Sequence, residues 1–247
     1  MDDLRTRALL IRQVDTGESD RVVTLLTEEQ GKVAALARGA RKSRKRFGAA
    51  LALFVLGMAE LEPRRRSGLP LLKSYDAIAV HAGIAKDLGA IAHGSYATEV
   101  IGELCPAGHP EPPLFALLME MYEYLDQGRP RSLVLRAFEL RALEAAGHGP
   151  QMGACVRCGC AEGREIAGLG FDPSRGGLLC QGCCRPSEVI STDAVRIMRG
   201  LGTGPLGQLG EDPAVEVAAE LRKALTGCVM EVVGRPLRTV EFIRKMS

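Results

Sequence analysis

The stretch 20–37, DRVVTLLTEEQGKVAALA, decides the fold of the first third of this chain. Its first part, Asp20–Thr27, is apolar and rich in β-branched residues, and Lys32–Ala37 is a second apolar run. The turn Glu28–Gly31 separates the two runs. Runs of this kind, joined by a short turn that contains Gly, predict two neighbouring β-strands.

Strand-like runs continue on both sides of this pair. Thr6–Val14 precedes it, and Leu51–Glu62 and Pro70–Ile78 follow it, with Pro63–Leu69 as the loop between the last two. Five short strands with turn signals between them favour a small closed barrel of the OB type. The pattern alone also fits a five-stranded β-sandwich or an SH3-like barrel.

Beyond Val80 the apolar period becomes helical. The clearest helix follows Pro112–Pro113, where apolar residues recur at positions 114, 117, 118, 121, 122 and 125. Similar patterns predict helices at Ile84–Leu104, Ser132–Ala146, Ser191–Arg199 and Asp212–Val233, the last with Asp212 as N-cap. The chain is therefore predicted to be α+β. Its expected domains are an OB barrel at 1–80, a helical domain at 81–152 and 188–247, and a cysteine-rich module inserted at 153–187.

Charge is distributed unevenly along the 247 residues. Residues 1–80 hold fifteen Lys and Arg against ten Asp and Glu, whereas residues 81–154 hold five against nine. Residues 155–247 are nearly balanced, with twelve against eleven, and the whole chain has a formal net charge of +2. A basic first third beside an acidic middle predicts a polyanionic partner for the barrel alone.

Composition and hydropathy exclude two classes of protein. Hydrophobic residues at 46% and charged residues at 25% are typical of a folded globular chain, not of a disordered one. The longest strongly apolar stretch without charge in the N-terminal half, Gly48–Ala59, is shorter than the about 20 residues of a membrane-spanning helix. The acidic start Met1–Asp3 lacks the basic region of a signal peptide. We therefore expect a cytoplasmic protein with no membrane partner.

Six of the eight cysteines fall between residues 155 and 184. In a reducing compartment such a cluster indicates metal binding, not disulfides. Two CxxC pairs separated by 21 residues can place four thiolates around one tetrahedral Zn²⁺. Protein would fill every coordination position, so the predicted zinc ion is structural. Its predicted ligands are Cys155, Cys158, Cys180 and Cys183.

Two details of this insert leave alternatives open. Cys160 can replace Cys158 as a ligand, and Cys184 can replace Cys183. The segment between the pairs is rich in turns and short of apolar residues, so we expect metal binding to supply its folding energy. A partial match to the zinc-deaminase signature, His109-x-Glu111 with the first CxxC pair, fails because Ala154 stands where that signature needs Pro.

Two basic clusters lie in the predicted barrel, one at 38–46 and one in the loop after the fourth strand. Two such clusters on one small barrel favour a phosphate-binding surface. The predicted nucleic-acid contacts are Arg38, Arg41, Lys42, Arg44, Lys45, Arg46, Arg64, Arg65 and Arg66. Only Phe47, Phe54 and Tyr75 are aromatic in this region, so we expect ionic, salt-sensitive binding with little base stacking.

No catalytic constellation emerges from the chain. None of the four histidines neighbours a nucleophile motif, and no P-loop pattern GxxxxGK[ST] is present. The formal GxGxxG at Gly202–Gly207 lies between two predicted helices, not after a strand as a dinucleotide-binding turn requires. We therefore expect a binding protein and not an enzyme.

Short motifs, in order along nearly the full length, resemble the RecO family of bacterial recombination mediators. They are TEEQGKV (27–33), RGARKS (38–43), RFG (46–48), FDP (171–173), GGLLC (176–180) and GRPL (234–237). The resemblance implies an N-terminal OB fold, a helical C-terminal domain and, in many members, an inserted four-cysteine zinc module.

The same resemblance implies a function and partners. It implies binding of single- and double-stranded DNA, annealing of complementary strands, and work beside RecR and single-strand-binding protein to load RecA, at the nucleoid. RecA is then an indirect partner. We further expect the acidic C-terminal tail of single-strand-binding protein to bind the helical domain near Arg129, Arg131, Arg136 and Arg141. The alternative is an RNA- or ribosome-associated OB/zinc binding protein.

Overall fold

The computed structural model describes residues 3–43, 46–47, 50–63, 68–128, 130–160 and 169–240. The chain divides into two compact units, Met1–Gly128 and Arg129–Ser247. Among the described residues, no helix has the length and apolar character needed to cross a membrane.

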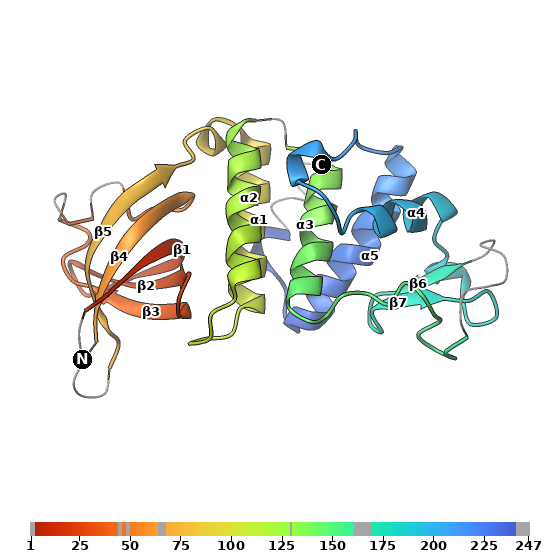
Figure 1. Ribbon diagram of the computed structural model, residues 1–247, viewed down its shortest axis with the longest axis horizontal. Helices are drawn as coiled ribbons and strands as arrows, with labels where there is room; N and C mark the ends of the chain where they lie inside the picture. Colours follow the sequence, from red (N-terminus) through yellow and green to blue (C-terminus); the bar gives the residue numbers. More distant parts are fainter. Residues whose placement is uncertain are drawn as a thin grey trace. The chain divides into compact units, whose positions relative to one another are not determined.

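The first unit opens with five strands that close into a barrel in the order β1-β2-β3-β5-β4 (Figure 1). They are β1 (Leu4–Thr16), β2 (Asp20–Thr27), β3 (Gly31–Ala37), β4 (Val55–Glu62) and β5 (Leu71–Val80). β1 pairs antiparallel with both β2 and β4, while β3 meets β5 in parallel through Leu36 and Leu71. The predicted OB-like fold is therefore confirmed.

The barrel core comes from alternate residues of its strands, as a period of two requires. Tyr75 is 1% exposed, and its hydroxyl lies 2.7 Å from the carbonyl oxygen of Ala8 and 3.0 Å from that of Val55. Gly57 makes room for this ring, because a Cβ there would lie 2.2 Å from it. The other buried members of the core are Ala8, Leu10, Val23, Leu25, Ala35, Ala37, Phe47, Leu51, Val55, Ala59, Leu61 and Leu72.

The fourth strand begins later than the sequence pattern predicts. Leu51 was expected in the strand, but it lies in a turn and packs into the barrel core. Phe54 follows with a φ of 64°, a left-handed conformation that an extended strand excludes. The strand therefore starts at Val55.

Two helices complete the first unit, α1 (Leu88–Leu104) and α2 (Pro112–Asp126), preceded by the short η1 (Ile84–Lys86). Asp87 caps α1 by accepting a hydrogen bond from the Ala90 N–H at 2.7 Å. Lys32 on β3 donates to the Gly102 carbonyl at 2.6 Å. Gly31 lies so near the segment after α1 that a Cβ would be 1.7 Å from the His109 oxygen. The motif TEEQGKV thus joins the barrel to α1.

The second unit contains α3 (Ser132–Ala145), α4 (Thr192–Gly200) and α5 (Val215–Val233). A two-stranded hairpin, β6 (Gly170–Asp172) and β7 (Gly177–Leu179), and the short η2 (Pro186–Glu188) and η3 (Leu206–Gln208) accompany them. α3 packs against α5, and their contact includes Arg136, Glu139 and Thr226. Ser191 caps α4 through the Ala194 N–H, as the sequence predicts.

The predicted start of the last helix is wrong. α5 begins at Val215, with Ala214 as its N-cap residue. The carboxylate of Asp212 instead accepts hydrogen bonds from the N–H groups of Ser132 and Leu133, at 3.1 and 2.7 Å. Arg131, the N-cap residue of α3, makes no side-chain capping bond, so Asp212 supplies the acceptor from a distant part of the chain.

Candidate functional site

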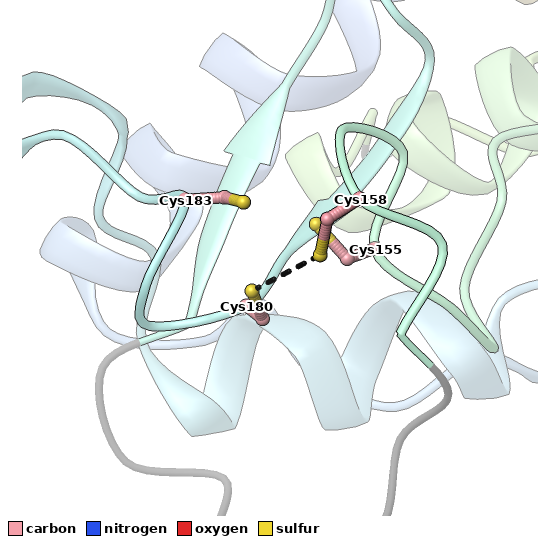
Figure 2. A group of neighbouring side chains, drawn as sticks. All are labelled: Cys155, Cys158, Cys180 and Cys183. Carbon is pink, nitrogen blue, oxygen red and sulfur yellow. Dashed lines mark hydrogen bonds between the residues drawn. The ribbon is translucent and has the colours of Figure 1, made fainter.

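Four cysteine sulfurs come together in the second unit (Figure 2). Cys155 and Cys158 lie on the loop before β6, and Cys180 and Cys183 follow β7. Their Sγ atoms all lie within 4.8 Å of one another, and those of Cys158 and Cys180 are 3.7 Å apart. Tetrahedral Zn–S bonds of about 2.3 Å place ligand sulfurs about 3.8 Å apart. The donor set and its spacing therefore fit a zinc ion.

Each CxxC pair forms a tight turn. The Gly159 N–H donates to the Cys155 carbonyl at 2.8 Å, with Gly159 at a φ of 72°. The N–H groups of Cys183 and Cys184 donate to the Cys180 carbonyl at 3.0 and 2.9 Å. Glycine suits the left-handed position because it has no Cβ. These turns direct both thiols of each pair toward the same side.

Hydrogen bonds and neighbouring thiols shift the thiol pKa values within the cluster. Burial opposes ionisation of Cys155, but backbone hydrogen bonds from Cys180, Cys158 and Arg157 outweigh it and lower its pKa to about 6. Hydrogen bonds with Cys158 and Cys180 raise the pKa of Cys183 to about 12. The cluster therefore contains one thiol that ionises easily, Cys155, and one that ionises with difficulty, Cys183. A metal ion that binds thiolates must displace the remaining thiol protons.

The two remaining cysteines of the insert differ in position. Cys160 is exposed, and its thiol hydrogen-bonds with those of Cys158 and Cys180, which raises the pKa of Cys160 to about 12. Cys184 turns its thiol away to donate to the Arg185 carbonyl at 3.3 Å. It packs against Gly170, where a Cβ would lie 2.5 Å from the sulfur. Of the two, only Cys160 is placed as a neighbour of the four-thiol group.

The insert contains a few buried apolar residues, and the supply of its folding energy by metal binding stays a prediction. Leu169, Phe171, Leu178 and Leu179 in and beside the hairpin are at most 7% exposed. Burial of such residues stabilises the hairpin, at about 25 cal/mol per Å² of apolar area. The loops that carry the cysteines contribute little to this packing, because only Cys155 is buried among the four clustered cysteines.

One group of basic residues lies at one end of the barrel. β2 starts beside the end of β3, and Leu36 near that end pairs with Leu71, the start of β5. The turn between β1 and β2, the loop after β3 and the loop before β5 therefore share one end. We call this end the basic rim. Its described cations are Arg38, Arg41, Lys42 and Arg46, all of them exposed. Arg44, Lys45, Arg64, Arg65 and Arg66 lie outside the described residues.

Hydrogen bonds fix the basic rim to the turn after β1 and to the start of β2. The Gly39 N–H donates to the Asp20 carboxylate at 2.8 Å, and this bond lowers the pKa of Asp20. The Arg41 N–H donates to the Ser19 carbonyl at 3.1 Å. The Arg46 guanidinium donates to the Arg38 carbonyl at 2.7 Å. The backbone of the rim is thus held in place, and the side chains of its four described cations remain exposed.

Two acidic residues lie near the rim cations: Asp20 interacts electrostatically with Arg38 and Arg46, and Asp15 with Arg41. Asp15 lies 2.9 Å from Arg21 Nε and 3.5 Å from Arg41 Nε. Asp15 and Arg41 are about half exposed, and ion pairs of this kind contribute about 0–1 kcal/mol. An incoming phosphate can therefore compete for Arg41 at little cost.

The barrel offers no aromatic platform for stacked bases. Phe47 and Tyr75 are 2% and 1% exposed and belong to the barrel core. Phe54 packs edge-on against Tyr122 of α2, with ring centroids 5.4 Å apart. All three aromatic residues of the first 80 positions are thus engaged within the fold.

The arginines near the predicted tail-binding surface make contacts within the second unit. Arg136 is 4% exposed and pairs with Glu139 at 3.2 Å. Arg131 donates to the carbonyls of Leu209 and Gly210, and Arg141 donates to those of Leu201 and Thr203. These arginines hold the second unit together, and Arg129 lies outside the described residues.

An OB-like barrel, a helical part and an inserted four-thiol module together define a class of architecture typical of nucleic-acid-handling proteins. Matches to family models identify the protein family within this class. The model described as "Recombination protein O N terminal" matches residues 1–81, and "Recombination protein O C terminal" matches residues 85–241. The chain therefore belongs to the RecO family, whose role is in DNA repair and recombination.

Individual relatives agree over the full length. The DNA repair protein RecO of Anaeromyxobacter sp. (strain K) is 42% identical over 252 residues, covering 100% of this chain and 98% of the relative. That of Geobacter sulfurreducens is 39% identical over 251 residues, with 100% of both chains covered. That of Myxococcus xanthus is 36% identical over 243 residues, covering 97% and 96%.

Proposed function

We propose that the basic rim binds the phosphate backbone of single- and double-stranded DNA, and that the protein anneals complementary strands as a mediator without enzymatic chemistry. The predicted contacts are the four described cations and, from the sequence, Arg44, Lys45 and Arg64–Arg66. The observation that carries this proposal is the gathering of exposed cations at one end of an OB-like barrel. Residues 1–80 then form the DNA-binding domain.

The absence of an aromatic platform in the barrel supports annealing over base-specific capture. Base stacking on aromatic side chains contributes about 1–3 kcal/mol per base in proteins that hold single strands tightly. Here Phe47 and Tyr75 are buried, so binding relies on phosphate contacts. Neutralised phosphates reduce the repulsion between two strands, and unstacked bases remain free to pair.

We further propose one structural Zn²⁺ ion in the module at 153–187. Cys155, Cys158, Cys180 and Cys183 would hold it, since their sulfurs lie within 4.8 Å of one another. A bound zinc ion would supply no open coordination position for substrate, only cross-links between the two CxxC turns. Its effect on DNA would therefore be indirect.

Family membership supports a set of protein partners. We propose that the protein acts with RecR and single-strand-binding protein, and through them helps to load RecA. We further propose that the acidic tail of single-strand-binding protein binds the helical domain near Arg131 and Arg141, whose guanidinium groups also donate to backbone carbonyls of the second unit.

The test is annealing of complementary oligonucleotides without ATP, on bare strands and on strands coated by single-strand-binding protein. We expect acceleration on both, and slower annealing on coated strands when the acidic tail is deleted. No acceleration on bare strands would contradict the mediator function. Equal rates with and without the tail would contradict tail capture alone. Folded RNA that outcompetes single-stranded DNA at equal salt would instead favour an RNA-binding protein.

A further inference from the structure

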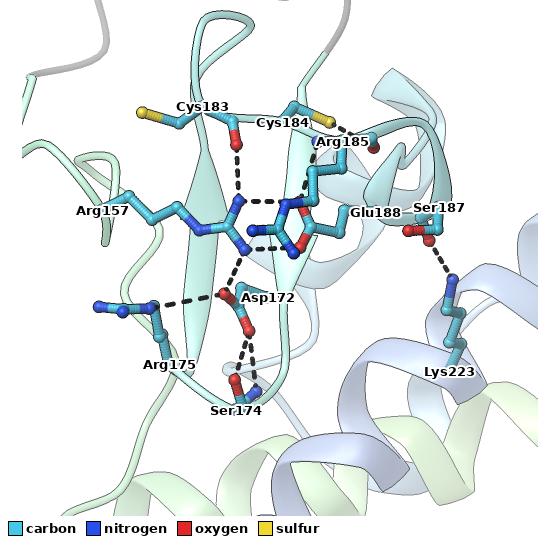
Figure 3. Close-up of polar contacts among 10 residues, drawn as sticks. All are labelled: Arg157, Asp172, Ser174, Arg175, Cys183, Cys184, Arg185, Ser187, Glu188 and Lys223. Atoms are coloured by element: carbon cyan, nitrogen blue, oxygen red, sulfur yellow. Dashed lines mark hydrogen bonds and ion pairs between the residues drawn. The ribbon is translucent and has the colours of Figure 1, made fainter.

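Arg157 occupies an unusual place, inside the first CxxC turn between two of the clustered thiols. Its side chain is 21% exposed and points across the module (Figure 3). Its Nη1 donates to the Cys183 carbonyl at 2.7 Å. Its Nη2 donates to Asp172 at 2.9 Å, and both nitrogens donate to the Glu188 carboxylate at 3.0 and 2.5 Å. One guanidinium therefore reaches three separate segments.

The acceptors of Arg157 are themselves held in place. Asp172, at the end of β6, also accepts from the N–H and the hydroxyl of Ser174, at 3.1 and 2.7 Å. Glu188, in η2, also accepts from the Arg185 N–H at 2.9 Å. Two fixed carboxylates match the planar fork of a guanidinium, a geometry that a lysine ammonium does not reproduce.

The contact with the Cys183 carbonyl matters most for the thiol cluster. It links the backbone of the second CxxC turn to a side chain of the first, so it sets the separation of the two turns. Arg175 offers a contrast in the same module. It is 59% exposed and approaches only Asp172, at 3.8 Å. Arg175 therefore shares the charge of Arg157 without its bridging position.

We propose that Arg157 is a positioning residue of the metal centre: its guanidinium clamps the two CxxC turns at the separation at which four thiols fit one ion. The inference rests on the proposed zinc site. Arg157 then strengthens metal binding although its side chain does not coordinate the ion. Partners that orient ligands from outside the coordination sphere typically change metal affinity about 10–100-fold.

The experiment compares full-length wild type, Arg157→Met, Arg157→Lys and the control Arg175→Met. Each protein is loaded with one equivalent of Zn²⁺ under reducing conditions, and zinc transfer to a chromogenic chelator is followed. We expect Arg157→Met to bind one zinc ion with about 10–100-fold weaker affinity. Arg157→Lys should recover only part of the loss, and Arg175→Met should match wild type.

A second readout separates positioning from general stability. Co²⁺ replaces Zn²⁺ in each protein, and the visible absorption of the cobalt–thiolate centre is recorded. Arg157→Met should change the intensity of these bands, since the thiols no longer hold the same tetrahedron, whereas Arg175→Met should leave them unchanged. If Arg157→Met does not fold, Glu188→Gln replaces it in the same two measurements. That variant keeps the arginine but weakens the hydrogen bonds between its guanidinium and residue 188.

Two results would overturn the proposal. The first is a zinc affinity and a cobalt spectrum of Arg157→Met, or of the substitute Glu188→Gln, that equal those of wild type. The second is an equal loss in Arg175→Met, which would assign the effect to charge and not to bridging. If the wild-type protein binds no zinc, the proposed zinc site is wrong and the inference about Arg157 is wrong with it. The wild-type measurement therefore distinguishes failure of the zinc site from failure of the Arg157 proposal.

Discussion

The barrel and the cysteine module reach a defined structure by different means. The barrel buries alternate apolar residues of five strands around Tyr75, and its interior needs nothing beyond side-chain packing. The module has a hairpin of two three-residue strands with a few buried apolar residues, and its cysteine loops bring four thiols together beside Arg157. We therefore expect the barrel to keep its fold when a thiol of the module is removed, and the cysteine loops to lose their order.

Removing one thiol is expected to give the largest effect, confined to the module. Cys158 is exposed, so Cys158→Ala leaves no cavity and reports on metal binding alone. Structural zinc contributes about 10–16 kcal/mol to folding in small zinc modules. We expect loss of zinc by mass spectrometry and fast hydrogen exchange in both CxxC turns, with protection retained in β1–β5.

The matched control for this variant is Cys160→Ala, an exposed neighbour outside the four-thiol group. It should keep zinc and normal exchange. Zinc retained in Cys158→Ala but lost in Cys160→Ala would move the ligand assignment to Cys160. Loss of hydrogen-exchange protection in the barrel of Cys158→Ala would contradict the claim that the barrel keeps its structure independently of the module.

Truncating the barrel core should give a smaller effect, confined to the barrel. Leu25 is fully buried, and Leu25→Ala is expected to lower the free energy of unfolding by about 2–5 kcal/mol. Zinc content and release rate should not change, because the module does not share this core. Chemical denaturation followed by circular dichroism gives the first quantity. Thr24 precedes Leu25 and lies on the opposite face of the strand, so Thr24→Ala should cost far less; an equal cost would argue against the core described here.

Removing the distant cap of α3 should give the smallest effect. Asp212 accepts hydrogen bonds from two N–H groups at the start of this helix, and loss of a cap costs about 1 kcal/mol. Asp212→Ala should therefore lower the midpoint of thermal unfolding slightly, while Glu211→Ala should not. Identical midpoints for the two variants would mean that Asp212 does not cap α3.

The barrel could be predicted from sequence because its signals are local. Apolar runs and turn residues within 20–37 specify neighbouring strands, and the spacing of the CxxC pairs specifies the four-thiol group. The start of β4 was missed because packing of Leu51 into the core overrides its strand-like pattern.

Long-range polar contacts could not be predicted in the same way. Asp212 looks like the cap of its own helix, yet it caps a helix whose start lies about 80 positions earlier in the chain. Arg136 looks like an exposed helical cation, yet it is buried against Glu139 and Thr226. The bridging role of Arg157 depends on Asp172 and Glu188, whose positions only the folded module defines. The sole local signal was an arginine inside a CxxC pair.

The most direct test of the account is the salt dependence of DNA binding by a rim variant. Arg38, Arg41 and Lys42 are exposed at the basic rim and are replaced together by Glu. The control replaces three exposed arginines of the second unit, Arg175, Arg196 and Arg222, and changes the net charge equally. Affinity for single-stranded and duplex DNA is measured across a salt series. Each lost phosphate contact should reduce the slope of log K against log salt by about 0.7 on single strands and about 0.9 on duplex. We predict weaker binding and flatter plots for the rim variant alone; unchanged affinity and slope in that variant would contradict the account.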